Sequence, residues 1–289
     1  MEPLCSTYAK ENISIMKPRE TLSILVLSCD NYSDLWDDFF NIKDKFWPEC
    51  PYQWYVVTES KHYERENVNV IKCGSELNWA GRFRKAAQSV QTPLVGVFLE
   101  DYFINAPVDN ARIEGLVAFA IERGVDYLDL GNVFKHKINQ PNRQYYSDHL
   151  MIIDKHLRYG LDTAAAIWKK DYLLDKLGEG DYSAWKFEAD RCAEAASEEG
   201  YKGLILVDDR LSFNVSEIPV VVQGMFYPPI IEDFRKRGYE IDTSKRKVMS
   251  RWQMFKYDFK RECGNIPFGH KFMKWFGTKI LGYKFFTED

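Results

Sequence analysis

Two adjacent carboxylates, Glu100 and Asp101, directly follow the apolar run Leu94–Leu99. Carboxylate oxygens at the end of a rigid strand suit hard cations such as Mg²⁺ or Mn²⁺, and such a cation offsets the charge of a diphosphate group. An isolated Glu-Asp pair also commonly ends a strand or begins a turn without any chemical role. The pair therefore predicts a metal or diphosphate site only where neighbouring segments support that interpretation.

Arginines precede the acidic pair in a segment with helical character, Trp79–Val90. Arg82 lies near the expected start of this helix, where a guanidinium group can form paired hydrogen bonds with a diphosphate. A solvated helix face is the alternative for both Arg82 and Arg84, and it is the favoured interpretation for Arg84. We therefore predict that Arg82 contacts a diphosphate, with Lys72 as a weaker candidate.

The elements expected to position these residues alternate between strand and helix. Helical patterns occur at Ser33–Phe46 and Trp79–Val90. Because ligands of parallel sheets collect at the carboxyl ends of the strands, Asp30, Thr58 and the acidic pair are expected at a common edge. The strands themselves are predicted from apolar runs, typical of strands buried on both faces, at Thr21–Ser28, Tyr52–Thr58, Val68–Lys72 and Leu94–Leu99.

The second half of the chain continues this alternation. Because no repeat or low-complexity linker interrupts it, the sequence predicts one α/β catalytic domain over 21–243, with a first half at 21–109 and a second at 110–243. An extension, 1–20, precedes the domain, and a basic aromatic helical tail, 244–289, follows it. The further elements are expected at Asn110–Arg123, Asp126–Leu130, Lys170–Leu177, Trp185–Ser197 and Gly203–Val207.

Four segments carry a family resemblance over most of the chain. They are Ser28-Cys-Asp-Asn-Tyr-Ser-Asp-Leu-Trp36, Asn78-Trp-Ala-Gly-Arg-Phe-Arg-Lys-Ala86, Phe98-Leu-Glu-Asp-Tyr-Phe103 and Ala165-Ala-Ile-Trp-Lys-Lys-Asp-Tyr-Leu173. With these segments in this order, the chain resembles GT-A glycosyltransferases, and more narrowly the capsular and cell-surface polysaccharide glycosyltransferases of bacteria. The resemblance implies a Rossmann-like α/β fold with a mostly parallel central sheet flanked by helices, and a nucleotide-sugar donor.

In that family the exit of the first strand forms the pocket for the nucleotide base, which assigns Ser28, Cys29, Asp30 and Tyr32 to the donor site. An Asp in such a pocket accepts a hydrogen bond from a base N–H group, and a ring stacks on the base. From the residues alone, a helix cap formed by Asp30 or Ser33 is an equally good interpretation, and the two roles can coexist.

The family's acidic motif resembles D-x-D, whose carboxylates meet the metal and the ribose. This chain departs from that motif, because Leu99 or Tyr102 stands where one of the acids is expected. The resemblance implies that Asp101 is the catalytic contact to the metal or the diphosphate and that Glu100 assists it. It leaves open whether Mn or Mg is required. Arg82 and Thr58 complete the predicted donor site.

Inverting transfer needs a carboxylate that takes a proton from the acceptor hydroxyl. The family draws this base from the start of a helix, and Glu188 in Trp185-Lys-Phe-Glu188 matches that place. Asp181 and Glu179 compete with it, and favourable charge in a first helical turn is an alternative explanation for Glu188. The predicted acceptor contacts are Trp185, as a sugar-stacking platform, and Trp168. A retaining enzyme would need no base there.

The charge and cysteine patterns narrow the possible functions. The net charge of −4 argues against a nucleic-acid binder. From Lys245 onward the chain carries +7, so the remainder carries −11. In this tail, basic residues are interleaved with aromatic residues. This pattern slightly favours contact with an anionic inner-membrane surface over packing on the catalytic domain. Scattered cysteines and a polar N-terminus without a signal-like run predict a cytoplasmic protein.

We therefore expect a glycosyltransferase that uses a nucleotide sugar, with UDP favoured, to extend a surface glycan or a lipid-linked acceptor. A nucleotidyltransferase of similar fold is one alternative, although it normally has a glycine-rich basic loop after the first strand, where this chain has Cys29-Asp30-Asn31. A non-catalytic carbohydrate-binding or assembly protein with a degenerate metal motif is the other. No Walker loop, G-x-S-x-G motif or zinc-ligand spacing is present.

Overall fold

The computed structural model describes residues 17–131, 133 and 135–265. The chain divides into two compact units, Met1–Pro219 and Val220–Asp289. Each unit is described by itself.

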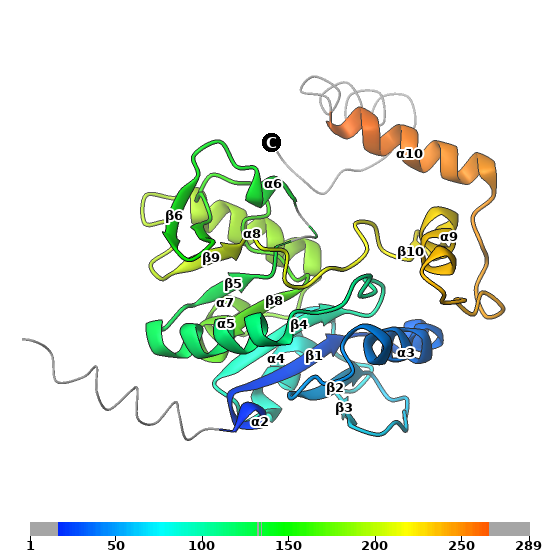
Figure 1. Ribbon diagram of the computed structural model, residues 1–289, viewed down its shortest axis with the longest axis horizontal. Coiled ribbons are helices and arrows are strands. Elements are labelled where there is room, and N and C mark those ends of the chain that lie inside the picture. The colour runs from blue at the N-terminus through cyan, green and yellow to red at the C-terminus, as the bar shows by residue number, and fades with distance from the viewer. Residues whose placement is uncertain (1–16, 132, 134, 266–289) are drawn as a thin grey trace, which may run out of the picture. The chain divides into compact units, whose positions relative to one another are not determined.

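A nine-stranded sheet forms the centre of the first unit, in the order β3-β2-β1-β4-β8-β5-β9-β7-β6 (Figure 1). Strands β3, β2, β1 and β4 are parallel to one another, and β5 is parallel to β9. This arrangement confirms the predicted α/β class with a mostly parallel central sheet. The strands are β1 (Leu22–Leu27), β2 (Gln53–Thr58), β3 (Val68–Lys72), β4 (Leu94–Leu99), β5 (Tyr127–Asp129), β6 (Gln144–Ser147), β7 (Leu150–Ile152), β8 (Ala166–Lys169) and β9 (Ile205–Asp208).

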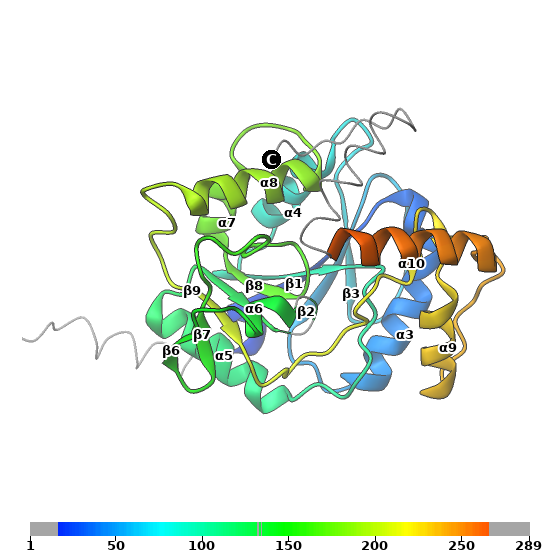
Figure 2. The ribbon, with the colours of Figure 1, turned by 90° about the horizontal axis from the view of Figure 1, so that it is seen from above.

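Helices cover both faces of this sheet, which explains why β1 is buried along its whole length. Figure 2 shows α4, α7 and α8 along one face and α3 and α5 along the other. Leu25 and Leu27 of β1 share one buried cluster with Phe83 of α4, whereas Phe39 of α3 packs against Trp54. The helices are α2 (Pro18–Thr21), the 3₁₀ helix η1 (Asp30–Leu35), α3 (Trp36–Phe46), α4 (Trp79–Ser89), α5 (Asn110–Arg123), α6 (Lys135–Ile138), α7 (Lys170–Leu177) and α8 (Ala184–Ala196).

Strand β8 runs antiparallel to both of its neighbours, β4 and β5. Ala166 at its start pairs with Val97 of β4 and with Asp129 of β5. The residues before Ala166 therefore lie at the edge where the parallel strands end. The apolar run in this part of the sequence predicts burial, but its direction in the sheet is decided by the tertiary pairing.

The second unit contains a short antiparallel pair and two helices. The pair consists of β10 (Val221–Val222) and β11 (Met225–Phe226), and the helices are α9 (Pro228–Lys236) and α10 (Arg251–Asn265). Helix α10 lies within the predicted helical tail, of which residues 266–289 fall outside the described residues, as do residues 1–16 of the predicted N-terminal extension. None of the described helices combines the length and apolar character needed to cross a bilayer.

Candidate functional site

The exits of β1 and β4 lie side by side. Leu27, the last residue of β1, pairs with Leu99, the last residue of β4. The next residues on each strand therefore begin at the same edge of the sheet. Burial raises the pKa of the Cys29 thiol, and the negative charge of Glu100 raises it further. Glu100 therefore lies near the exit of β1, and a shared site formed with Asp101 remains a prediction.

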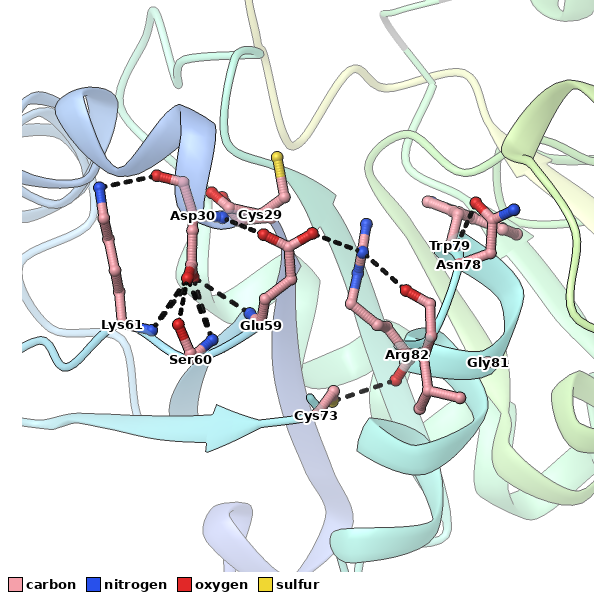
Figure 3. Close-up of polar contacts among 12 residues, drawn as sticks. Cys29, Asp30, Glu59, Ser60, Lys61, Cys73, Asn78, Trp79, Gly81 and Arg82 are labelled. Atoms are coloured by element: carbon pink, nitrogen blue, oxygen red, sulfur yellow. Dashed lines mark hydrogen bonds and ion pairs between the residues drawn. The ribbon is translucent and has the colours of Figure 1, made fainter. Parts of the chain in front are cut away.

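Glu59 connects the β1 exit to helix α4. Its Oε2 accepts a hydrogen bond from the backbone N–H of Asp30 at 3.0 Å, and its Oε1 accepts one from Nη1 of Arg82 at 2.9 Å (Figure 3). The same Nη1 donates to the carbonyl oxygen of Leu77 at 3.0 Å. Within the described part of the chain, Nε and Nη2 of Arg82 make no hydrogen bond.

Sequence reasoning missed Glu59, although a signal was present. Glu59 directly follows Thr58, the last residue of β2, so it belongs to the same set of strand-end residues as Asp30. Its contact with Arg82 depends on how helix α4 packs against the sheet. Glu59 holds Arg82 in one orientation and partly neutralises it.

The carboxylate of Asp30 is engaged with the loop that follows β2. It accepts hydrogen bonds from the backbone N–H groups of Glu59, Ser60 and Lys61 at 3.1 to 3.2 Å, and from the Ser60 hydroxyl at 2.6 Å. Burial alone would raise the pKa of Asp30, but these hydrogen bonds outweigh it and lower the pKa. Asp30 does not act as a helix cap, because it lies inside η1 and neither η1 nor α3 has a side-chain hydrogen bond at its N-cap. A contact with a nucleotide base would have to share oxygens that already accept several bonds.

The other predicted donor-site residues differ in their access to a ligand. The Ser28 hydroxyl is buried and accepts a hydrogen bond from Nε1 of Trp36 at 2.8 Å, and Thr58 is fully buried and donates to the Lys61 carbonyl at 3.2 Å. Cys29 and Tyr32 are half-buried. Ser28 and Thr58 thus hold the segments after β1 and β2 in place, whereas Cys29 and Tyr32 are partly exposed at this edge of the sheet.

The acidic pair itself combines a buried and a half-buried carboxylate, Glu100 and Asp101. Over the described ranges, no group of three or more His, Cys, Asp or Glu side chains is arranged to hold a metal ion. Mg²⁺ is commonly held by one or two carboxylates together with substrate phosphates. The donor set of Glu100 and Asp101 fits that mode of binding, in which the cation arrives with a diphosphate.

Further along the same edge of the sheet, Glu188 of α8 lies beside the segment that leads into β8. Its Oε1 accepts a hydrogen bond from the Thr163 hydroxyl at 3.4 Å. Burial raises the pKa of Glu188 to about 7, and the negative charge of Asp162 contributes, whereas Lys137 opposes the shift. A carboxyl group with a pKa near neutrality is suited to taking up and releasing a proton.

A buried polar cluster lies next to Glu188. Lys137 is fully buried and forms ion pairs with Asp129 and Asp162. Asp129 also accepts hydrogen bonds from the Tyr127 hydroxyl at 3.0 Å and from the Gly131 N–H at 2.7 Å. The sequence analysis did not identify this cluster, although an Asp inside the predicted apolar strand Asp126–Leu130 was a signal for it. The cluster holds the end of β5 and the approach to β8 together.

Helix α8 is positioned by the preceding loop, which docks on α4. The Asp181 carboxylate accepts hydrogen bonds from the N–H groups of Asn78 at 2.7 Å and Gly81 at 2.9 Å. Arg84 donates to the carbonyl oxygens of Gly178 and Gly180. The favoured interpretation of Arg84 as a solvated side chain is therefore wrong. Asp181 is a competing candidate for the base, but its oxygens already accept hydrogen bonds at the N-terminus of α4. A Cβ atom on Gly81 would lie 2.9 Å from Asp181 Oδ1, so glycine permits this approach.

Asp181→Ala should lower the free energy of unfolding by about 1 to 2 kcal/mol, because two N–H groups at the start of α4 lose their acceptor. Denaturant unfolding measures this change. Glu179→Ala is the matched control, since Glu179 lies exposed in the same loop and should be close to neutral. Equal stability of the two variants would contradict the docking role of Asp181.

The two tryptophans predicted to contact an acceptor occupy different environments. Trp185, at the start of α8, is 73% exposed. Trp168 has no exposed surface, and its ring packs edge-on against Tyr127 with centroids 4.6 Å apart. Trp168 therefore belongs to the core and the prediction that it contacts an acceptor is wrong, whereas a contact with Trp185 remains a prediction.

Comparisons with known proteins give no family assignment. No protein-family model matches the chain, and no curated protein matches its sequence. Among solved structures, a crystal structure of S. aureus TarS 1–349 is similar with 14% identity and a TM-score of 0.42, over 65% of this chain and 58% of that one. This chain therefore spans less than two thirds of that structure's length.

Two other solved structures show a similar degree of likeness. GalNAc-T7 with UDP, GalNAc and Mn²⁺ matches 91% of this chain and 57% of its own, at 10% identity and a TM-score of 0.43. A UDP-glucose pyrophosphorylase complexed with UDP-glucose matches 68% of this chain and 91% of its own, at 6% identity and a TM-score of 0.40. Identities and scores this low do not assign an activity.

The site thus has two chemically different parts along one edge of the sheet. One part offers the partly neutralised guanidinium of Arg82 and the carboxylates of Glu100 and Asp101, which together suit a phosphate-rich ligand and its cation. The other offers Glu188, whose proton can exchange near neutral pH, and the exposed ring of Trp185. This combination can bind a charged leaving group and remove a proton from a hydroxyl group.

Proposed function

We propose that the chain is a glycosyltransferase that moves a sugar from a nucleotide-sugar donor, with a UDP-sugar favoured, to a glycan or lipid-linked acceptor with inversion. One observation carries the proposal: the same edge of the sheet holds Arg82 beside the β1 exit and Glu188 beside the segment entering β8. Transfer needs both groups, one at the leaving diphosphate and one at the attacking hydroxyl.

In the proposed donor site, Nε and Nη2 of Arg82 bind the diphosphate, and Glu59 keeps the guanidinium in place from the opposite side. Asp101, with Glu100 as its helper, would hold a divalent cation, which would supply positive charge beside the diphosphate. The cation would stabilise the charge that develops on the leaving nucleotide. Cys29 and Tyr32 lie where the nucleoside is proposed to rest.

In the proposed acceptor site, the sugar stacks on Trp185 and its hydroxyl points to Glu188. The proton of that hydroxyl passes to a carboxylate oxygen of Glu188 while the hydroxyl oxygen forms a bond to the anomeric carbon. The bond between the anomeric carbon and the diphosphate breaks, and the nucleotide diphosphate leaves with the electron pair. Inversion follows because the nucleophile and the leaving group occupy opposite faces of the sugar.

A nucleotide titration followed by an assay of donor hydrolysis tests this function. The proposal expects UDP to bind more tightly when Mn²⁺ is present, and the bound donor to be hydrolysed slowly without an acceptor. Release of pyrophosphate from a nucleoside triphosphate and a sugar phosphate would instead identify a nucleotidyltransferase. Absence of any nucleotide binding would favour a non-catalytic carbohydrate-binding protein.

Arg82→Gln should raise the Kd for UDP about tenfold or more, because a charge-assisted pair of hydrogen bonds to the diphosphate is lost. Isothermal titration calorimetry measures this change. Arg123→Gln is the control: Arg123 ends α5, which connects the end of β4 to the start of β5, and β4 and β5 run in the same direction, so Arg123 lies at the opposite edge of the sheet. An unchanged Kd for the Arg82 variant would remove Arg82 from the site.

A further inference from the structure

Among the described residues, the contacts found between helix α10 and the rest of the second unit lie along one side. The Tyr257 ring lies edge-on against Tyr227, with centroids 5.6 Å apart, and the Tyr227 hydroxyl donates to Asp258 at 2.6 Å. Met254 and Arg261 are half-buried on the same side as these two residues. The packed face of α10 therefore has a defined partner.

The opposite side of α10 carries an aromatic stripe, defined here as Trp252, Phe255 and Phe259. These side chains are 62%, 58% and 56% exposed. Their spacing places them on one face of the helix. Trp252 stacks on Phe255 with centroids 5.7 Å apart, and Phe255 on Phe259 at 6.2 Å, so the rings form a continuous apolar surface.

Basic residues border the aromatic stripe. Lys256 lies with its ammonium group 5.0 Å from the centre of the Trp252 ring, and Arg251 is exposed beside it. The acidic residue Asp258 is on the packed side, where it accepts the bond from Tyr227. The apolar surface is thus bordered by positive charge, and the segment from Lys245 onward carries +7.

We propose that the aromatic stripe of α10 docks on an anionic lipid surface. The rings would insert at the boundary between headgroups and acyl chains, while Arg251 and Lys256 reach the headgroup phosphates. Charge complementarity selects this occupant over a second copy of the chain, because two identical basic faces repel each other. Lipid docking does not depend on the proposed transferase activity, so either can fail without the other.

Flotation of the full chain with phosphatidylglycerol-containing vesicles tests the proposal. A variant with Trp252→Ser, Phe255→Ser and Phe259→Ser should bind these vesicles about tenfold more weakly or worse, with an unchanged thermal midpoint. Tyr145→Ser is the control, because Tyr145 is a 53% exposed ring in the first unit and its loss should not affect flotation. Pure phosphatidylcholine vesicles should bind the unaltered chain weakly.

A charge variant separates lipid docking from nonspecific adhesion of apolar rings. Replacing Arg251 and Lys256 with Gln should weaken binding to the anionic vesicles and reduce its sensitivity to salt. Equal flotation of all variants, or no flotation of the unaltered chain, would overturn the proposal. A clear fall in the thermal midpoint of the aromatic variant would also overturn it, since the stripe would then be covered by the chain itself.

Discussion

Glu188→Gln should lower turnover about a hundredfold or more while donor binding is kept. The amide has nearly the shape of the carboxyl group and can still accept the hydrogen bond from Thr163, but it cannot take a proton from the acceptor. Steady-state transfer assays with saturating donor measure the loss, and UDP titration checks binding. Asp190→Asn on the same helix is the matched control, because its ion pair with Lys186 is exposed and should not matter for turnover.

The pH dependence of the unaltered protein gives a second measurement on the same residue. The pKa of Glu188 is raised to about 7 by burial and by Asp162. A general base works in its deprotonated form, so turnover should fall as the pH drops below about 7 and level off above it. Unchanged turnover in Glu188→Gln, or a profile that is flat through this range, would exclude Glu188 as the base.

Asp101→Ala should abolish transfer and leave the thermal midpoint nearly unchanged. Asp101 follows the end of β4 and is half-buried, so its removal takes away a proposed cation and diphosphate contact without opening the core. Loss of cation-dependent charge stabilisation at a leaving group is expected to cost several kcal/mol of activation free energy. Transfer assays across a range of Mn²⁺ concentrations, with thermal unfolding in parallel, measure both effects.

Asp171→Asn is the control for Asp101. Lys169, at the end of the antiparallel strand β8, pairs with Leu94 at the start of β4, so Asp171 in the first turn of α7 lies at the opposite edge of the sheet. This variant should keep full activity. Substantial transfer by the Asp101 variant would remove Asp101 from the reaction, and the role of the acidic pair would then be structural.

The elements of the first unit were largely predictable because their signals are local. Strand β4 and helices α5 and α7 have the bounds that the sequence analysis assigned to them. For α5 the physical cause is visible at both ends: the Asp109 side chain accepts from the N–H of Arg112, and Gly124 ends the helix in a left-handed conformation. The continuous apolar run of β1 likewise predicted a strand covered on both faces.

Residue types near the site were also predictable, but their partners were not. A strand followed by Glu100-Asp101 is visible in the sequence, as is an arginine near the start of a helix. The carboxylate of Asp30 was expected at a base or a helix cap, yet its partners are Ser60 and Lys61, which lie on the loop after another strand. Such pairing depends on which strands are neighbours, and no local pattern encodes it.

The sequence alone determined that this chain forms an α/β sheet with polar and charged residues at the ends of its strands, because hydrophobic periodicity and caps act over a few residues. Only the tertiary structure decided that Glu59 orients Arg82, that Asp181 holds the start of α4, and that Lys137 is buried beside Glu188. These contacts join residues that are distant along the chain. Their formation depends on strand order, the antiparallel direction of β8 and the packing of helices on the sheet, which are properties of the whole fold.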